Sequence, residues 1–213
     1  METNWAAEHL QVIRTLMERS AVYRRALAPV MTFNGAVGTA AALAGWGFKI
    51  NSPRGFILFW ACVGALAVSG SFLLVRRQAL KESEPFWSPP TRRITQAMLP
   101  ALVAGFIVGA VVWAHVASAP DNVGNVLGMI WLPQSWVVLY GCAFHAAGFF
   151  MPRGMRIFGW AFVMGGCALF AAGIPDWPPR PYYAHAIMGF FFGVLHLAYG
   201  VYLYFTEQRK NET

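Results

Sequence analysis

Long apolar runs alternate with short polar segments along most of this chain. A helix needs about 20 mostly apolar residues to cross the hydrocarbon core of a bilayer. Six runs meet this length, and all nine acidic residues lie outside them. Because none of the runs alternates with a period of two, the pattern predicts helices rather than membrane strands. The predicted fold is an all-α polytopic bundle with six transmembrane helices, at Leu27–Phe48, Phe56–Val75, Ala97–Ser118, Met129–Phe150, Met155–Ile174 and Tyr183–Phe205.

The segment before the first run has a different pattern. Between Asn4 and Arg25, apolar residues recur at helical spacing and charged residues occupy the other faces. This predicts an amphipathic helix lying on the cytoplasmic membrane surface. The predicted organisation is therefore a juxtamembrane helix over residues 1–26, a six-span domain over 27–206 and a cytoplasmic tail over 207–213. A role in topology alone and a docking site for a cytoplasmic protein partner both stay open for the helix.

Composition supports a membrane location, and the placement of charged residues predicts how the chain is oriented in the membrane. The chain is 57% hydrophobic and 12% charged, whereas soluble domains carry about 25% charged residues. If the N-terminus is cytoplasmic, only three of the sixteen basic residues fall in outer loops, namely Lys49, Arg54 and Arg180. The positive-inside rule then predicts that both termini are cytoplasmic. The net charge of +7 is accounted for by topology, so no nucleic-acid partner is predicted.

Small and aromatic residues give weaker signals. The three cysteines lie in apolar runs without a Cys-x-x-Cys pair, which predicts buried thiols rather than a zinc or redox motif. Gly-x-x-x-Gly occurs at Gly105–Gly109 and Gly189–Gly193, a spacing that lets helices approach closely. Packing within the chain is the usual reason for it, and a homo-oligomer stays open. Most tryptophans lie near span ends, which is typical of an interfacial belt.

Four of the five histidines lie in or beside predicted spans. With 1.5 Å of rise per residue, His115 and His185 lie near the outer face, whereas His145 and His196 lie roughly 24 and 20 Å from it. His185 and His196 are eleven residues apart, which returns the helix to within about 20° of the same direction. One face of the last helix is therefore expected to present a histidine to each of two tiers.

Three interpretations of these histidines stay open. Paired imidazoles at two depths suit a bis-histidine haem b carrier, with His115, His145, His185 and His196 as candidate ligands. The outer pair with two loop acids suits a zinc site for metal-assisted hydrolysis, formed by His115, Asp121, Asp176 and His185. The third interpretation is structural: neutral histidines that form hydrogen bonds with polar neighbours such as Asn34 or Tyr140.

Two stretches carry a resemblance. "LQVIRTLMERSAVYRRALAP", with Ile13-Arg14 and Met17 to Ser20, resembles the N-terminal box of a family of small bacterial multi-span membrane proteins. "FGVLHLAYGVYLYF" resembles the last helix of that family and includes His196. The resemblance implies a bacterial inner membrane and supplies no catalytic residues.

The function predicted from these observations is that of a non-enzymatic protein in a lipid bilayer, because no catalytic constellation is complete. A sensor, an accessory subunit and a small-solute conduit are the forms considered. The haem carrier and the outward-facing metal-dependent hydrolase remain the alternatives.

Overall fold

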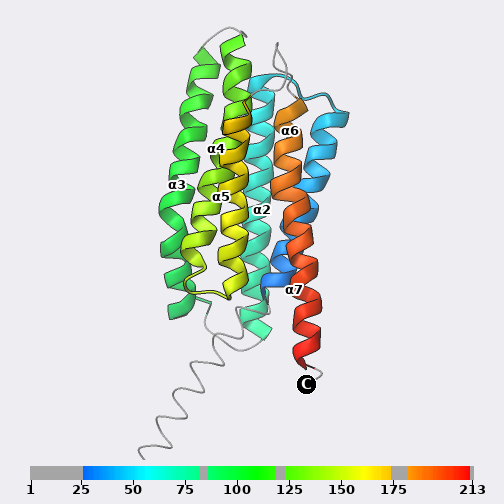
Figure 1. Cartoon of the computed structure of the whole chain (residues 1–213), viewed down its shortest axis with the longest axis vertical. Helices are drawn as coiled ribbons and strands as arrows, with labels where there is room; N and C mark the ends of the chain where they lie inside the picture. Colours follow the sequence, from blue (N-terminus) through cyan, green and yellow to red (C-terminus); the bar gives the residue numbers. More distant parts are fainter. Residues whose placement is uncertain (1–25, 82–85, 119–122, 174–181, 212–213) are drawn as a thin grey trace, which may run out of the picture.

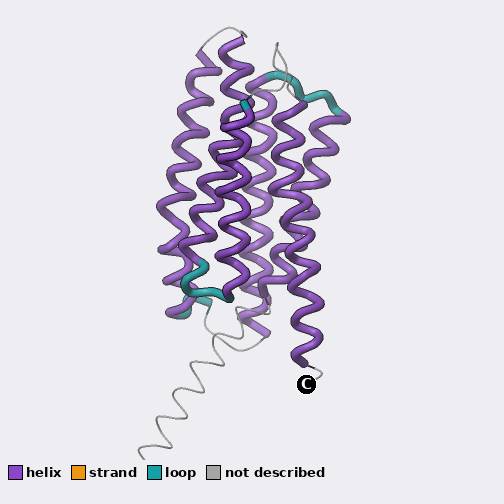
Figure 2. The backbone as a smooth tube through the Cα atoms, viewed as in Figure 1, coloured by secondary structure: helices purple, strands orange, loops and turns teal. Residues whose placement is uncertain are grey.

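The computed structural model describes residues 26–81, 86–118, 123–173 and 182–211. These residues contain helices and no strand, and six of the helices are long and apolar enough to cross a membrane. They lie side by side in one bundle, and successive helices run in opposite directions (Figures 1 and 2). The prediction of an all-α six-helix bundle is confirmed. The amphipathic surface helix predicted before residue 26 lies outside the described residues.

The helices are the first helix Ala26–Gly47, α2 Pro53–Lys81, α3 Pro89–Ser118, α4 Val123–Ala147 and α5 Arg153–Ala172. The last span consists of α6 Tyr182–Met188, a π-helical segment η1 Gly189–Val194 and α7 Leu195–Asn211. α7 thus continues into the predicted tail.

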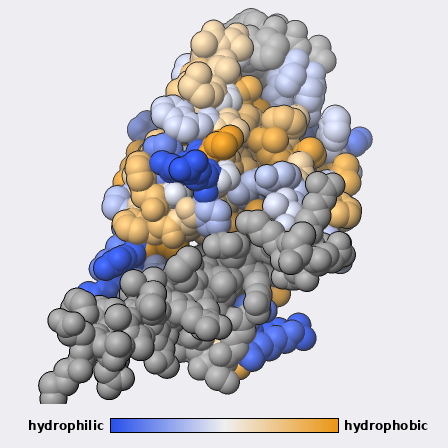
Figure 3. Space-filling model, turned by 60° about the horizontal axis from the view of Figure 1, so that its bottom comes forward, coloured by the Kyte–Doolittle hydropathy of each residue, from blue (hydrophilic) through white to orange (hydrophobic). Residues whose placement is uncertain are grey.

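α2 and α3 are longer than their apolar runs. The apolar run of α2 ends at Val75, but the helix continues without a break to Lys81. Pro89 and Pro90 lie in the first turn of α3, where the missing N–H of a proline has no intrahelical partner to lose. Figure 3 views the molecule from this end, and strongly hydrophilic residues appear there beside the hydrophobic flanks.

Glycines bring the first helix and the last span into backbone contact. A side chain at Gly38 would meet the carbonyl oxygen of Phe192, and a Cβ at Gly193 would lie 2.8 Å from the backbone nitrogen of Thr39. Gly189 faces the Cβ of Ala42. The Gly189–Gly193 motif therefore packs two helices of the same chain, as small residues do in membrane helices.

The second motif has a different role, because it receives a large side chain. Gly105 and Gly109 on α3 face the indole of Trp136 from α4. The Nε1–H of Trp136 donates a hydrogen bond of 2.9 Å to the carbonyl oxygen of Gly105. Elsewhere α4 packs on α5 through Gly141 and Gly159, each of which lies against the backbone of the other helix.

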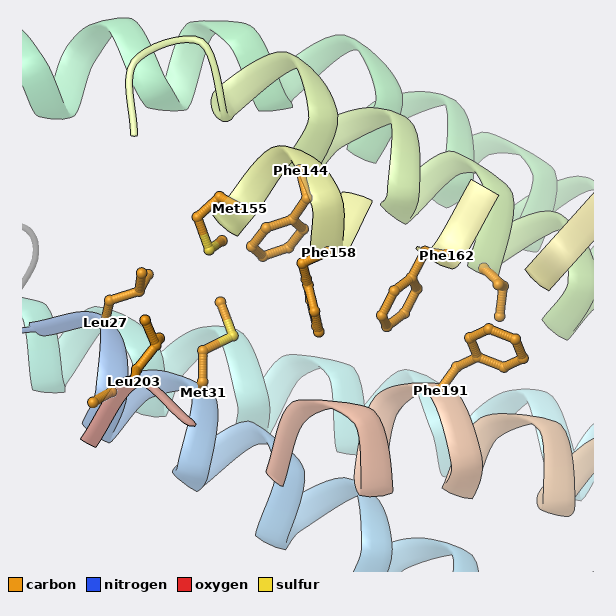
Figure 4. Close-up of a cluster of buried hydrophobic side chains, with 10 residues drawn as sticks. Leu27, Met31, Phe144, Met155, Phe158, Phe162, Phe191 and Leu203 are labelled. Carbon is orange, nitrogen blue, oxygen red and sulfur yellow. The ribbon is translucent and has the colours of Figure 1, made fainter. Parts of the chain in front are cut away.

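The main apolar core lies between these two glycine-packed pairs. It joins the first helix and the last span to α4 and α5, through residues such as Met31, Phe158 and Phe191 (Figure 4). The prediction of buried thiols is wrong, because Cys62, Cys142 and Cys167 are exposed. An apolar run does not specify which of its faces is covered by protein, since both faces of a membrane helix can be apolar.

We predict that Gly38→Ala destabilises the fold. Its methyl group would press on the Phe192 carbonyl, and overpacking of this kind costs about 1–3 kcal/mol. Gly64→Ala on α2 is the matched control, because a Cβ there has no neighbour within 4 Å. Thermal unfolding in mild detergent checks this: the midpoint should fall for Gly38→Ala only, and equal midpoints would contradict the packing described.

Candidate functional site

His196 lies at the centre of the bundle, 1% exposed. Its ring is surrounded by aromatic rings from α4, α5 and the last span, and the closest ring centroid is that of Phe158 at 5.1 Å. The Nε2 atom lies 2.8 Å from the hydroxyl of Tyr140, and Nδ1 lies 2.9 Å from the carbonyl oxygen of Phe191. Tyr140 is one of the polar residues that were expected from the sequence to form such a bond.

The bond from His196 to Phe191 is made possible by the π-helical segment. In a regular α-helix, the N–H of Leu195 would donate to the carbonyl of Phe191. Here it donates to Phe190 instead, as a π turn requires. The Phe191 carbonyl accepts from Nδ1–H of His196. Because a carbonyl can only accept, Nδ1 carries the proton, and Nε2 accepts from the Tyr140 hydroxyl.

In His185 the donor and acceptor roles of the two ring nitrogens are reversed relative to His196. It is 1% exposed, and its Nδ1 accepts from the indole N–H of Trp60 at 3.2 Å. Its Nε2 lies 2.9 Å from the carbonyl oxygen of Ile50, so Nε2 carries the proton. Gly45 lies directly against the imidazole ring, which leaves no room there for a side chain. Both ring nitrogens are satisfied in the neutral form.

His185 and His196 do not share a face of the last span. His185 contacts Trp60 and Phe56 of α2, whereas His196 contacts residues of α4 and α5. The expectation of a shared face assumed a continuous α-helix. The π turn contains roughly one extra residue, which rotates everything after it by roughly 100°.

The two members of each predicted tier have different surroundings. Tyr140 of α4 faces His196, and five further residues turn the helix by roughly 140°, so His145 points elsewhere. The ring of His145 lies edge-on to Phe149 and Trp160, and its buried Nδ1 has no hydrogen-bond partner. His115 is exposed near the end of α3. In the described residues, neither His115 and His185 nor His145 and His196 form a contacting pair.

Only the two histidines of the predicted zinc site, His115 and His185, lie within the described residues. Asp121 and Asp176 lie outside the described residues. Within those that are described, no three His, Cys, Asp or Glu side chains come close enough together to hold a metal ion.

A cavity of about 680 Å³ lies beside His196. Its inner wall includes Met188, Phe192 and His196 of the last span together with Tyr140 of α4. Its outer part runs between α2 and α3, where the lining side chains of Leu58 and Phe106 are 52% and 77% exposed. The cavity therefore extends from the outer surface of the bundle to its centre, and its volume is within the range of small-molecule sites.

Polar groups enter this apolar cavity at two places. One is the Tyr140–His196 pair. The other is formed by Asn34 of the first helix and Ser71 of α2, whose hydroxyl donates to the Asn34 amide oxygen at 3.0 Å. No Asp, Glu, Lys or Arg is among the described lining residues. The cavity can therefore hold a mostly apolar, uncharged molecule and form hydrogen bonds with it.

Two residues, Trp60 and Ser71, have roles in the site that were not predicted from the sequence. Most tryptophans were expected to form an interfacial belt, but Trp60 is 3% exposed and forms a hydrogen bond with His185. Ser71 is one polar side chain in a long apolar run, as is Asn34 in the run before it. Asn34 was named as a polar candidate from the sequence, and the same criterion applied to the run of α2 would have found Ser71.

The chain was compared with protein-family models, with curated proteins and with solved structures, and none of the three comparisons found a match.

We predict opposite tautomers for the two buried histidines. His185 should carry its proton on Nε2 and His196 on Nδ1, because each of these atoms faces a carbonyl oxygen. ¹⁵N NMR of imidazole-labelled protein in detergent measures this directly. The same tautomer at both positions would contradict the hydrogen bonds described.

We predict that Tyr140→Phe destabilises the protein by about 1–3 kcal/mol, because it leaves Nε2 of a buried histidine without a donor. Tyr202→Phe makes the same chemical change on an exposed ring and should leave stability almost unchanged. Thermal unfolding of the two variants tests this, and equal unfolding midpoints would contradict the predicted difference between the two hydroxyls.

Proposed function

We propose that this chain is a bacterial inner-membrane protein that binds an uncharged, mostly apolar molecule from the bilayer, as a sensor or accessory subunit rather than an enzyme. The cavity between α2 and α3 carries the proposal. It opens on the apolar flank of the bundle and ends beside buried polar groups. A small-solute conduit is less well supported: ion paths use rings of carbonyls or charged side chains, and no described residue lining the cavity is charged.

The hydrogen bonds of the histidines favour this function over haem or zinc binding. In His185 and His196, both ring nitrogens take part in hydrogen bonds to protein groups. An iron or zinc ion would need one of these nitrogens as its ligand. Coordination at either histidine would therefore require breaking a buried hydrogen bond.

The proposed orientation places both termini in the cytoplasm. It is supported by the basic residues at the end where α2 stops and α3 starts, which include Arg76, Arg77, Arg92 and Arg93. At the opposite end, Arg54 of α2 donates to the carbonyl oxygens of Val116 and Ala117 and so satisfies the last turn of α3.

We predict that a fluorescent-protein fusion after Thr213 is bright in bacterial cells, whereas an alkaline phosphatase fusion at the same site is inactive. Phosphatase fused after Asn51, in the first outer loop, serves as the control and should be active. The reverse result at Thr213 would reject the proposed orientation.

We predict that n-decylbenzene, an apolar probe, stabilises the purified protein in mild detergent. At a hundredfold excess over its Kd, the unfolding midpoint should rise by roughly 5–10 °C. Gly64→Phe should abolish the shift, because Gly64 lines the cavity and a side chain there would enter open space. Gly47→Phe is the matched control, since Gly47 is exposed with open space around it and does not line the cavity. No shift in the wild type, or the same shift in Gly64→Phe, would contradict ligand binding in this cavity.

A further inference from the structure

The two polar pairs of the cavity lie at the same depth in the membrane. Gly35, the neighbour of Asn34, packs against the backbone nitrogen of Leu197, the neighbour of His196. Asn34 and His196 are therefore at levels within about one helical turn of 5.4 Å. Asn34 and Ser71 come from the first helix and α2, whereas Tyr140 and His196 come from α4 and the last span. A ligand in the cavity can therefore meet polar groups contributed by two separate pairs of helices.

The existing hydrogen bonds determine what these groups can still offer. The Tyr140 hydroxyl uses its proton on His196 and keeps lone pairs on its oxygen. The Ser71 hydroxyl uses its proton on Asn34 and also keeps lone pairs. That bond uses only the amide oxygen of Asn34, so it leaves the two N–H donors of the amide. Each pair can thus accept a hydrogen bond from a ligand hydroxyl without losing a bond that it already has.

The shape and polarity of the cavity define the rest of the ligand. Its lining follows α2 from Ile57 to Ser71, which is about 21 Å of helix. The lining contains flat aromatic side chains, including Phe192 and Trp136, and no described charged residue. A charged lipid headgroup would have no counter-charge at this depth. An uncharged flat ring with an apolar tail satisfies all of these conditions.

We infer that the ligand is a membrane quinol, a flat ring with two hydroxyl groups on opposite sides and an apolar tail. One hydroxyl donates to the Tyr140 oxygen, and the other lies between Ser71 and Asn34, where it can both donate and accept. The tail runs toward the opening between α2 and α3. This inference rests on the proposed function and adds the chemical class of the ligand.

The experiment compares three probes with the same ten-carbon tail: 2-decylhydroquinone, 2-decyl-1,4-benzoquinone and n-decylbenzene. Affinities are measured from thermal stabilisation of the full chain in detergent under nitrogen, at equal probe-to-detergent ratios. We expect 2-decylhydroquinone to bind at least about tenfold more tightly than n-decylbenzene, since each hydrogen bond contributes about three- to tenfold. The benzoquinone should bind more weakly than the hydroquinone, because it has no hydroxyl group to donate a hydrogen bond.

The double variant Asn34→Leu with Ser71→Ala tests the site itself. Both groups are removed together, so that neither can replace the other as the acceptor. The preference for 2-decylhydroquinone over n-decylbenzene should fall about three- to tenfold. Ser69→Ala, an exposed serine of α2 that does not line the cavity, should keep the wild-type preference.

The outcomes separate the two proposals. If n-decylbenzene binds and 2-decylhydroquinone binds no more tightly, the quinol assignment is wrong and the cavity still binds apolar molecules. If no probe binds the wild type, both proposals fail. An unchanged preference in the double variant would also overturn the assignment. Should that variant not fold, the affinities of the three probes for the wild-type protein decide the question. If 2-decyl-1,4-benzoquinone binds as tightly as 2-decylhydroquinone, the ligand needs no hydrogen-bond donor and the quinol assignment is wrong.

Discussion

The carbonyl oxygen of Phe191 is the group on which the interior of this bundle depends. A polar backbone group in the hydrocarbon region must find its partner within the protein, and the π turn takes away the usual partner of this carbonyl. His196 replaces it through Nδ1–H. That bond fixes the tautomer, the tautomer makes Nε2 an acceptor, and Nε2 then holds the Tyr140 hydroxyl at the cavity wall. One local irregularity thus determines the chemistry of the site.

The position of the cavity follows from how unevenly the helices are packed. Glycines allow the first helix to contact the last span, and α4 to contact α5, through their backbones. Among the residues that the structure describes, no glycine brings the backbones of α2 and α3 into a comparable contact. Only 11% of the most apolar window in each is buried, against 44% in α4. The cavity lies on this loosely packed flank of the bundle.

The sequence predicted the number and type of the helices well, because a run of about 20 apolar residues has few alternatives. The sequence predicted less well which face of each helix is covered by other parts of the protein. The exposed cysteines and the buried Trp60 both show that an apolar run does not reveal which side meets protein. The histidine geometry failed for a separate reason: a π turn shifts the helical phase, and no residue pattern around Gly189–Val194 signalled one. Tyr140 could be proposed as a partner of His196 from composition alone, but not chosen over the other polar residues.

Tyr140 belongs to both the cavity and the core, and this connects the proposed ligand to the fold. Its ring packs against Phe144 and Phe162, which are core residues, and its hydroxyl forms the hydrogen bond to His196. A ligand that donates a hydrogen bond to the Tyr140 oxygen would act on the same hydroxyl group that links α4 to the π turn of the last span. Hydrogen bonds in such chains polarise one another. A sensor built in this way would need no additional relay, because the residue that contacts the ligand also contributes to the packing of α4, α5 and the last span.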